Sequence, residues 1–105
     1  MIGEALKGHL DLLLLAILAQ GPAHGYAVIE TLRARSDGVF DLPEGTIYPA
    51  LHRLENQGLL RSQWSEDSAR RKRIYHLTAK GQKALTTHQN EWQKFSKAIN
   101  ATVGI

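Results

Sequence analysis

The stretch EGTIYPALHRLENQGLL, residues 44–60, has the apolar spacing of one amphipathic helix. Gly58 suits the left-handed residue that closes such a helix. Pro49 lacks a backbone N–H, so we expect it near the first turn, with Thr46 as the N-cap. The stripe that would face a core consists of Ile47, Ala50, Leu51 and Leu54.

The opposite face of this helix is rich in hydrogen-bonding groups and has no carboxylate at its centre. Such a face fits a helix that reads a groove of nucleic acid. It fits an ordinary surface helix equally well, because many amphipathic helices bind nothing. The rest of the chain has to decide between these interpretations. The residues on this face are Tyr48, Pro49, His52, Arg53 and Asn56.

Length and composition exclude several classes of protein. A chain of 105 residues, 43% of them hydrophobic, corresponds to one domain with a core. The absence of cysteine excludes disulfides and zinc fingers, and the net charge of +3 is compatible with nucleic acid. The longest apolar run, Leu10 to Ala19, contains Asp11 and is too short to span a bilayer. We therefore expect a cytoplasmic protein with no membrane partner.

Two helices are expected upstream of this stretch. The first covers residues 1–20 and is apolar on two faces, so it needs cover on more than one side. That cover comes either from a second subunit or from other elements of the same chain. Residues 21–25 contain Gly and Pro and predict a turn, and a second helix follows over residues 25–35. With the helix in 44–60, these elements form a helix-turn-helix arrangement.

A β-hairpin is expected after the helix-turn-helix. Residues 60–65 and 73–77 have the alternation of two strands, and the polar residues 66–72 join them. Such a hairpin is the wing of a winged helix-turn-helix domain. Residues 70–73 place four cations in a row. A charge run is usually a solvated face, but this one closely follows a candidate reading helix, which favours contact with DNA.

The last predicted helix begins after its N-cap, Thr78, and reaches about Ala101. Its apolar residues recur at close to a heptad spacing, and a small domain has little surface to cover them. A second copy of the chain is the natural cover, and folding back on residues 1–20 is the alternative. The predicted dimer-interface residues are Leu10, Leu14, Leu85, Trp92, Phe95 and Ile99.

The predicted fold class is therefore mainly α with a small β-hairpin. One domain, 1–105, combines a winged helix-turn-helix over about residues 1–77 with a dimerisation helix over residues 78–101. The five histidines are scattered, and none pairs with another at i, i+4. No nucleophile elbow, phosphate loop or paired-carboxylate pattern occurs. We expect neither an enzyme nor a metal or other cofactor.

Four parts of the chain together resemble the PadR family of transcriptional regulators. They are HGYAVIETL at 24–32, EGTIYPALHRLENQGLL at 44–60, RRKRIYHLTAKG at 70–81 and the C-terminal helix that carries Trp92. The length is similar to that of the small members, which have a single C-terminal helix. The resemblance implies a homodimer built by the first and last helices, and repression of nearby genes that a small molecule relieves.

In the family, the third helix enters the major groove and the wing touches the flanking minor groove or backbone. Tyr48 would contact a phosphate, with packing on the second helix as its alternative. Arg53 would reach a guanine edge or, as we favour, a phosphate, and His52 either reads a base or is an exposed spectator. Gly45 allows close approach to DNA or simply serves a turn. The expected DNA-binding residues are Gly45, Thr46, Tyr48, Pro49, His52, Arg53, Arg70, Arg71 and Lys72.

Trp92 has two interpretations. In some relatives an aromatic residue of the last helix lines a pore at the dimer interface and stacks on planar ligands, which makes Trp92 a candidate contact for a small aromatic effector. The favoured alternative is that Trp92 fills the interface, because aromatic residues at helical spacing are usually core. For the whole chain, a winged-helix module that binds proteins is the alternative to a regulator of double-stranded DNA. The cations beside a carboxylate-free helix face favour DNA.

Overall fold

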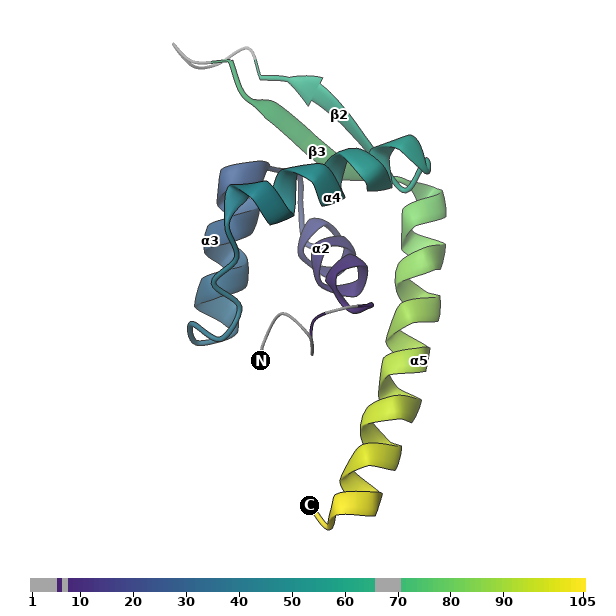
Figure 1. The fold of residues 1–105 in the computed structure, drawn as a ribbon. Coiled ribbons are helices and arrows are strands. Elements are labelled where there is room, and N and C mark those ends of the chain that lie inside the picture. The colour runs from purple at the N-terminus through teal and green to yellow at the C-terminus, as the bar shows by residue number, and fades with distance from the viewer. Residues whose placement is uncertain (1–5, 7, 66–70) are drawn as a thin grey trace.

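A computed structural model describes residues 6, 8–65 and 71–105. They form a group of helices with a small antiparallel sheet of strand order β1-β3-β2 at one edge (Figure 1). The predicted class, mainly helical with a winged β-hairpin, is confirmed. The described elements are α2 (Leu10–Leu18), β1 (Ala23–His24), α3 (Gly25–Arg35), α4 (Glu44–Asn56), β2 (Leu60–Trp64), β3 (Arg73–Leu77) and α5 (Ala79–Val103).

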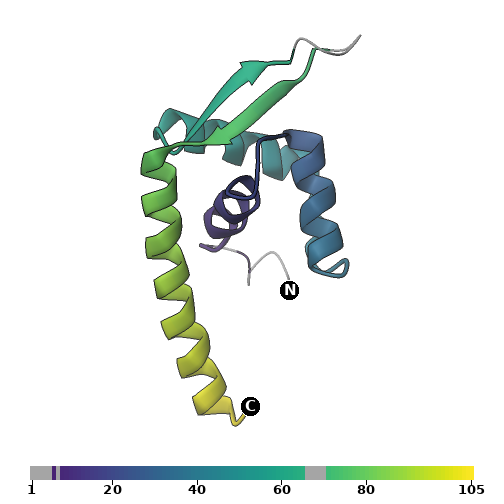
Figure 2. The ribbon, with the colours of Figure 1, turned by 180° about the vertical axis from the view of Figure 1, so that it is seen from behind.

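Helix α2 lies at the centre of the fold. Helices α3, α4 and α5 and strand β3 contact it, and the view from behind shows the same enclosure (Figure 2). The chain itself therefore covers the first helix on several sides. Leu14 of α2 and Leu85 of α5 are 0% and 2% exposed. Their own chain buries both side chains, so the structure places them in the core of the subunit rather than on its surface; their prediction as dimer-interface residues stays untested.

The first helix is shorter than the predicted range 1–20. Gly8 has a left-handed backbone (φ 87°), which interrupts a helix, and α2 begins two residues later. The start of the predicted helix, residues 1–5 and 7, lies outside the described part of the chain. The second helix, in contrast, has the predicted bounds of residues 25–35.

Helix α4 buries its predicted stripe but begins earlier than expected. It starts at Glu44 after Pro43, whose carbonyl accepts from the backbone N–H of Thr46. Thr46 therefore lies inside the first turn, and its prediction as N-cap is wrong. Pro49 lies in the second turn, where it lacks the N–H that would bond to the carbonyl of Gly45. The buried stripe is Ile47, Ala50, Leu51 and Leu54, as predicted.

The two predicted strands of the wing pair in antiparallel register. The tip between them, residues 66–70, lies outside the described residues, and with it the predicted DNA contact Arg70. A third strand, β1, was not predicted. It pairs with β3, with Ala23 opposite Tyr75. The Gly-Pro signal just before it indicates a turn and gives no sign of a two-residue strand.

The start of α5 is fixed to the end of α4. The hydroxyl of Thr78 accepts from the backbone N–H of Gly81, so Thr78 is the N-cap as predicted. The same hydroxyl lies 2.7 Å from the carbonyl oxygen of Gly58, to which it donates. The ammonium of Lys80 donates to the carbonyl of Gln57 at 2.9 Å. The carbonyls of the two residues that follow α4 are thus satisfied by the start of α5, whereas the last carbonyls of α4 itself accept from the backbone N–H groups of residues 57–59.

Beyond Leu85, α5 leaves the core; it borders the start of α2 as far as Phe95, and its last turns extend away from the other elements (Figure 1). The molecule is 52 Å long in its longest direction. The apolar residues of this part are 41% to 61% exposed. No helix among the described residues is long and apolar enough to cross a membrane. The exposed apolar residues of α5, here called the α5 stripe, are Trp92, Phe95, Ile99 and Val103.

We expect Gly81→Ala to destabilise the fold. A Cβ at this position would overlap the carbonyl oxygen of Leu59 and lie 2.7 Å from Cδ1 of Leu77. Overpacking of this kind typically costs about 1–3 kcal/mol of the free energy of unfolding, measured by urea titration. Gly45→Ala is the matched control, because open space surrounds that helical glycine. The control should gain about 0.5–1 kcal/mol. Equal stability of both variants would contradict the close contact of Gly81 with Leu59 and Leu77.

Candidate nucleic-acid interface

The outer face of α4 is polar and open. Gly45, Pro49, His52 and Asn56 are exposed and lie opposite the buried stripe. The carboxylate of Glu55 lies on a half-buried flank, where it accepts from the hydroxyl of Ser62 at 2.6 Å. The centre of the face therefore presents hydrogen-bonding groups and no carboxylate. Such a face suits contact with the base edges and phosphates of DNA.

The wing carries a tryptophan between two arginines. Trp64, at the end of β2, is 48% exposed. The guanidinium carbons of Arg71 and Arg73 lie 4.7 Å and 5.0 Å from the centre of its ring, which is cation–π distance. Nε of Arg73 also donates to the hydroxyl of Ser62, which bonds to Glu55 of α4. The Trp64 ring thus contacts both Arg71 and Arg73, and Arg73 is also linked to α4 by hydrogen bonds.

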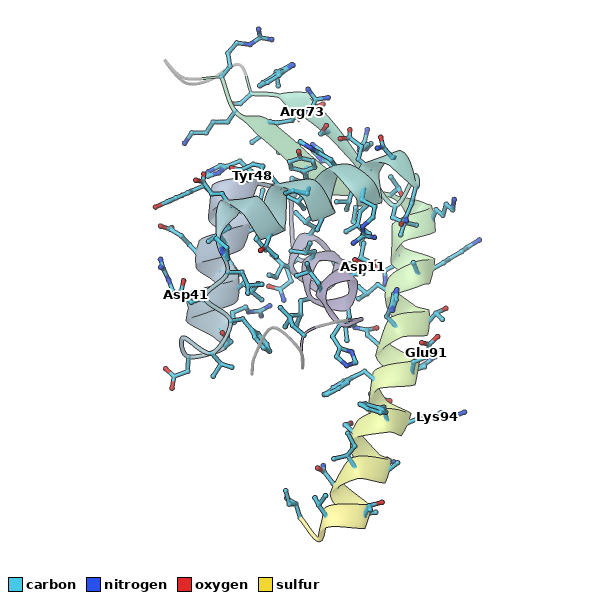
Figure 3. All side chains as sticks on the ribbon, viewed as in Figure 1. Asp11, Asp41, Tyr48, Arg73, Glu91 and Lys94 are labelled. Atoms are coloured by element: carbon cyan, nitrogen blue, oxygen red, sulfur yellow. The ribbon has the colours of Figure 1, made fainter. Side chains whose placement is uncertain are left out.

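A hollow of about 330 Å³ separates α4 from the wing. Figure 3 shows Tyr48 on the side of α4 that faces the hairpin, and Arg73 on the hairpin itself. The structure brings four predicted residues together here, Tyr48, His52, Arg71 and Lys72. Other residues of this surface were not predicted, although a tryptophan just before a run of cations is a signal for one of them. These further residues are His24, Gly25, Tyr26, Trp64 and Tyr75, and Arg73 of the predicted cation run joins them.

Tyr48 packs on the second helix, as its alternative interpretation stated. A Cβ on Gly25, the first residue of α3, would lie 2.5 Å from the Tyr48 ring. Burial raises the pKa of the Tyr48 phenol, the charge of Glu44 raises it further, and a hydrogen bond from the backbone of Tyr26 lowers it. The neutral hydroxyl thus lies beside the first turn of α3. The position of the Tyr48 ring is therefore explained by its packing on α3, and the side chain is half-buried.

Two predicted residues lie on the other flank of α4. Thr46 and Arg53 border a hollow of about 500 Å³ together with Leu10 and Asp11 of α2. The guanidinium of Arg53 donates to both carboxylate oxygens of Asp11, and this hydrogen bonding raises the pKa of Arg53. Gly45 and Pro49 lie between the two flanks. The predicted DNA contacts on α4 therefore lie on one outer face. One edge of this face borders α3 and the wing, and the other edge borders α2.

A model of the transcriptional regulator PadR-like family matches residues 14–87, from α2 into α5. The chain belongs to this family. PadR-family proteins are transcriptional regulators, which implies DNA binding and excludes an enzyme. Within the residues that the structure describes, no group of three or more His, Asp or Glu side chains is placed to hold a metal ion.

Relatives of this PadR-family chain cover most of its length. It is 31% identical to Transcriptional regulator Rv3488 of Mycobacterium tuberculosis over 77% of this chain and 73% of that protein. A PadR family transcription regulator from Clostridium difficile is 35% identical, with a TM-score of 0.81 over 91% of this chain and 99% of that chain. A transcriptional regulator from Clostridium thermocellum is 30% identical, with a TM-score of 0.87 over 93% and 96% of the two chains.

We expect Arg71→Ala to reduce the salt dependence of DNA binding by this PadR-family chain. Each phosphate that a cation neutralises adds about 0.9 to the slope of log affinity against log salt. The slope should therefore fall by about 0.9 per subunit in a salt titration with duplex DNA. Arg33→Ala is the control, because Arg33 lies in the last turn of α3 and pairs with Asp41. Equal slopes for both variants would mean that the wing is only solvated.

Proposed function

We propose that this PadR-family regulator is a repressor that binds an inverted-repeat operator as a homodimer and is released by a small aromatic effector. The observation that carries the proposal is the α5 stripe, which extends beyond the body that holds α4. A homodimer through α5 would give the assembly two copies of the outer face of α4. The assignment as a repressor rests on the family resemblance.

The α5 stripe supports dimerisation because the chain leaves it uncovered. Trp92 and Ile99 are 42% and 41% exposed, and Phe95 is 51% exposed. Removing apolar surface from water contributes about 25 cal/mol per Å². The stripe continues the side of α5 on which Leu85 is buried, so one helix face has a core at one end and solvent at the other. A second copy of the chain supplies the missing cover.

We expect the double variant Phe95→Glu, Ile99→Glu to be monomeric, because four carboxylate-bearing positions in a dimer would repel in an apolar interface. Sedimentation equilibrium measures the mass of the particle in solution. The affinity of the double variant for the operator should fall when the dimer is lost. Lys94→Glu is the control with the same change in net charge. Figure 3 shows Lys94 projecting from α5 away from α2. A stable monomer for the unchanged protein would rule out this assembly.

The operator follows from the symmetry of such a dimer. Two copies of α4 would enter successive major grooves on one side of the duplex, with half-site centres about 10 bp, or about 34 Å, apart or a multiple of this. His52 lies on the exposed outer face and is the candidate for a base contact. Tyr48 and the wing cations flank it and suit phosphates, which position the protein without reading sequence.

The candidate effector site is a groove of about 280 Å³ between the start of α2 and α5. The ring of His9 meets Trp92 edge-on, with centroids 5.2 Å apart, and Phe95 lies beside them. Offset and edge-on contacts with such rings favour a planar aromatic molecule. The favoured alternative for Trp92, an interface-filling side chain, uses the same exposed ring. A partial cover by the second subunit leaves room for both roles.

The experiment that tests this function is selection of bound duplexes from a random pool. We expect an enriched inverted repeat. Against single-base variants of that operator, His52→Ala should alter the preference at one base position per half-site. Tyr48→Phe should lower affinity by about 1 kcal/mol with the preference kept. If no duplex is enriched, a protein-interaction module becomes the better interpretation of the fold.

A further inference from the structure

Arg53 of α4 is held by a carboxylate from another helix. Its Nη1 donates to Oδ2 of Asp11 at 3.1 Å, and its Nη2 donates to Oδ1 at 2.6 Å. This two-pronged geometry fixes the plane of the guanidinium, which one hydrogen bond would leave free to turn. The helix dipoles stabilise both charges, because the negative Asp11 is in the first turn of α2 and the positive Arg53 is in the last turn of α4.

The guanidinium remains available to a third group. The Arg53 side chain is 47% exposed, whereas that of Asp11 is 27% exposed. A guanidinium has five N–H donors, and Asp11 accepts from only two of its nitrogens. The remaining donors belong to an exposed flank of α4, two turns along the same side from Thr46. That flank adjoins the outer face on which His52 lies.

The ion pair between Asp11 and Arg53 adds little to the stability of the fold. Ion pairs with this degree of exposure typically contribute little to the free energy of unfolding. A carboxylate close to a DNA-binding helix also repels phosphates and so lowers affinity for any duplex. Asp11 therefore has a cost for DNA binding in general, which a contribution to one particular complex would offset.

We propose that Asp11 is a positioning residue for DNA recognition, which holds Arg53 in the one orientation that meets a phosphate when α4 lies in its operator. The inference rests on the proposed function, in which α4 enters the major groove. A freely turning arginine finds a phosphate in any register of the protein on the duplex. A fixed arginine meets one only when α4 sits in the groove in the pose that its base contacts impose on the operator. Asp11 therefore favours the operator indirectly, through this pose, over sequences that do not impose it.

The test compares the full-length Asp11→Asn variant with the unchanged protein on two duplexes, the selected operator and a scrambled sequence of the same length. We expect affinity for the operator to fall about tenfold, the order of one hydrogen bond between charged groups. Affinity for the scrambled duplex should not fall. Asp41→Asn is the matched control, because it removes the same charge from an exposed ion pair with Arg33. The control should shift both affinities alike.

Arg53→Lys supplies the second arm, because lysine keeps the charge and loses the planar fork. It should reduce the ratio of the two affinities as Asp11→Asn does, and the double variant should lose no more than either single variant. An unchanged ratio for Asp11→Asn, or losses that add in the double variant, would overturn the inference and leave the proposed function standing. If the unchanged protein prefers neither duplex, both fall.

Discussion

The hydrogen bonds between the end of α4 and the start of α5 hold the two functional helices in one unit. The turn that closes α4 leaves the carbonyls of Gln57 and Gly58 outside the helix. Lys80 and Thr78 at the start of α5 donate to these two carbonyls. The absence of a side chain at Gly81 allows the backbones to approach. The direction of α5 is therefore fixed relative to the outer face of α4.

This junction also determines where the wing lies. Strand β2 begins four residues after α4 ends, and β3 leads directly into α5. The hydrogen bonds from Arg73 through Ser62 to Glu55 tie the hairpin to α4. Trp64 then holds two arginine side chains close to its ring. A positive surface thus forms beside a carboxylate-free helix face without any charge being buried.

Helix α5 passes through two environments. At Leu85 it contributes to the core around α2, whereas from Trp92 onward its apolar side is exposed. The groove at His9 lies where these environments meet. The first turn of α2 borders this groove on one side and carries Asp11, the partner of Arg53, on the other. One short helix end therefore contacts both the candidate effector groove and α4, the candidate reading helix.

The sequence by itself determined the features that depend on near neighbours along the chain. The bounds of the second helix, the N-cap at Thr78 and the left-handed Gly58 follow from apolar period and cap chemistry. Local signals failed at the start of α4, where we placed Pro49 near the first turn and the chain begins the helix at Glu44.

Only the tertiary structure decided which distant residues meet. Asp11 and Arg53 are 42 positions apart, and neither periodicity nor spacing pairs them. The packing of Tyr48 on Gly25 and the burial of Leu14 by its own chain arise in the same way. An apolar pattern predicts that a face of a helix is covered. It does not predict which residues cover that face, because the hydrophobic effect has no direction. The identity of each cover is a property of the packed fold.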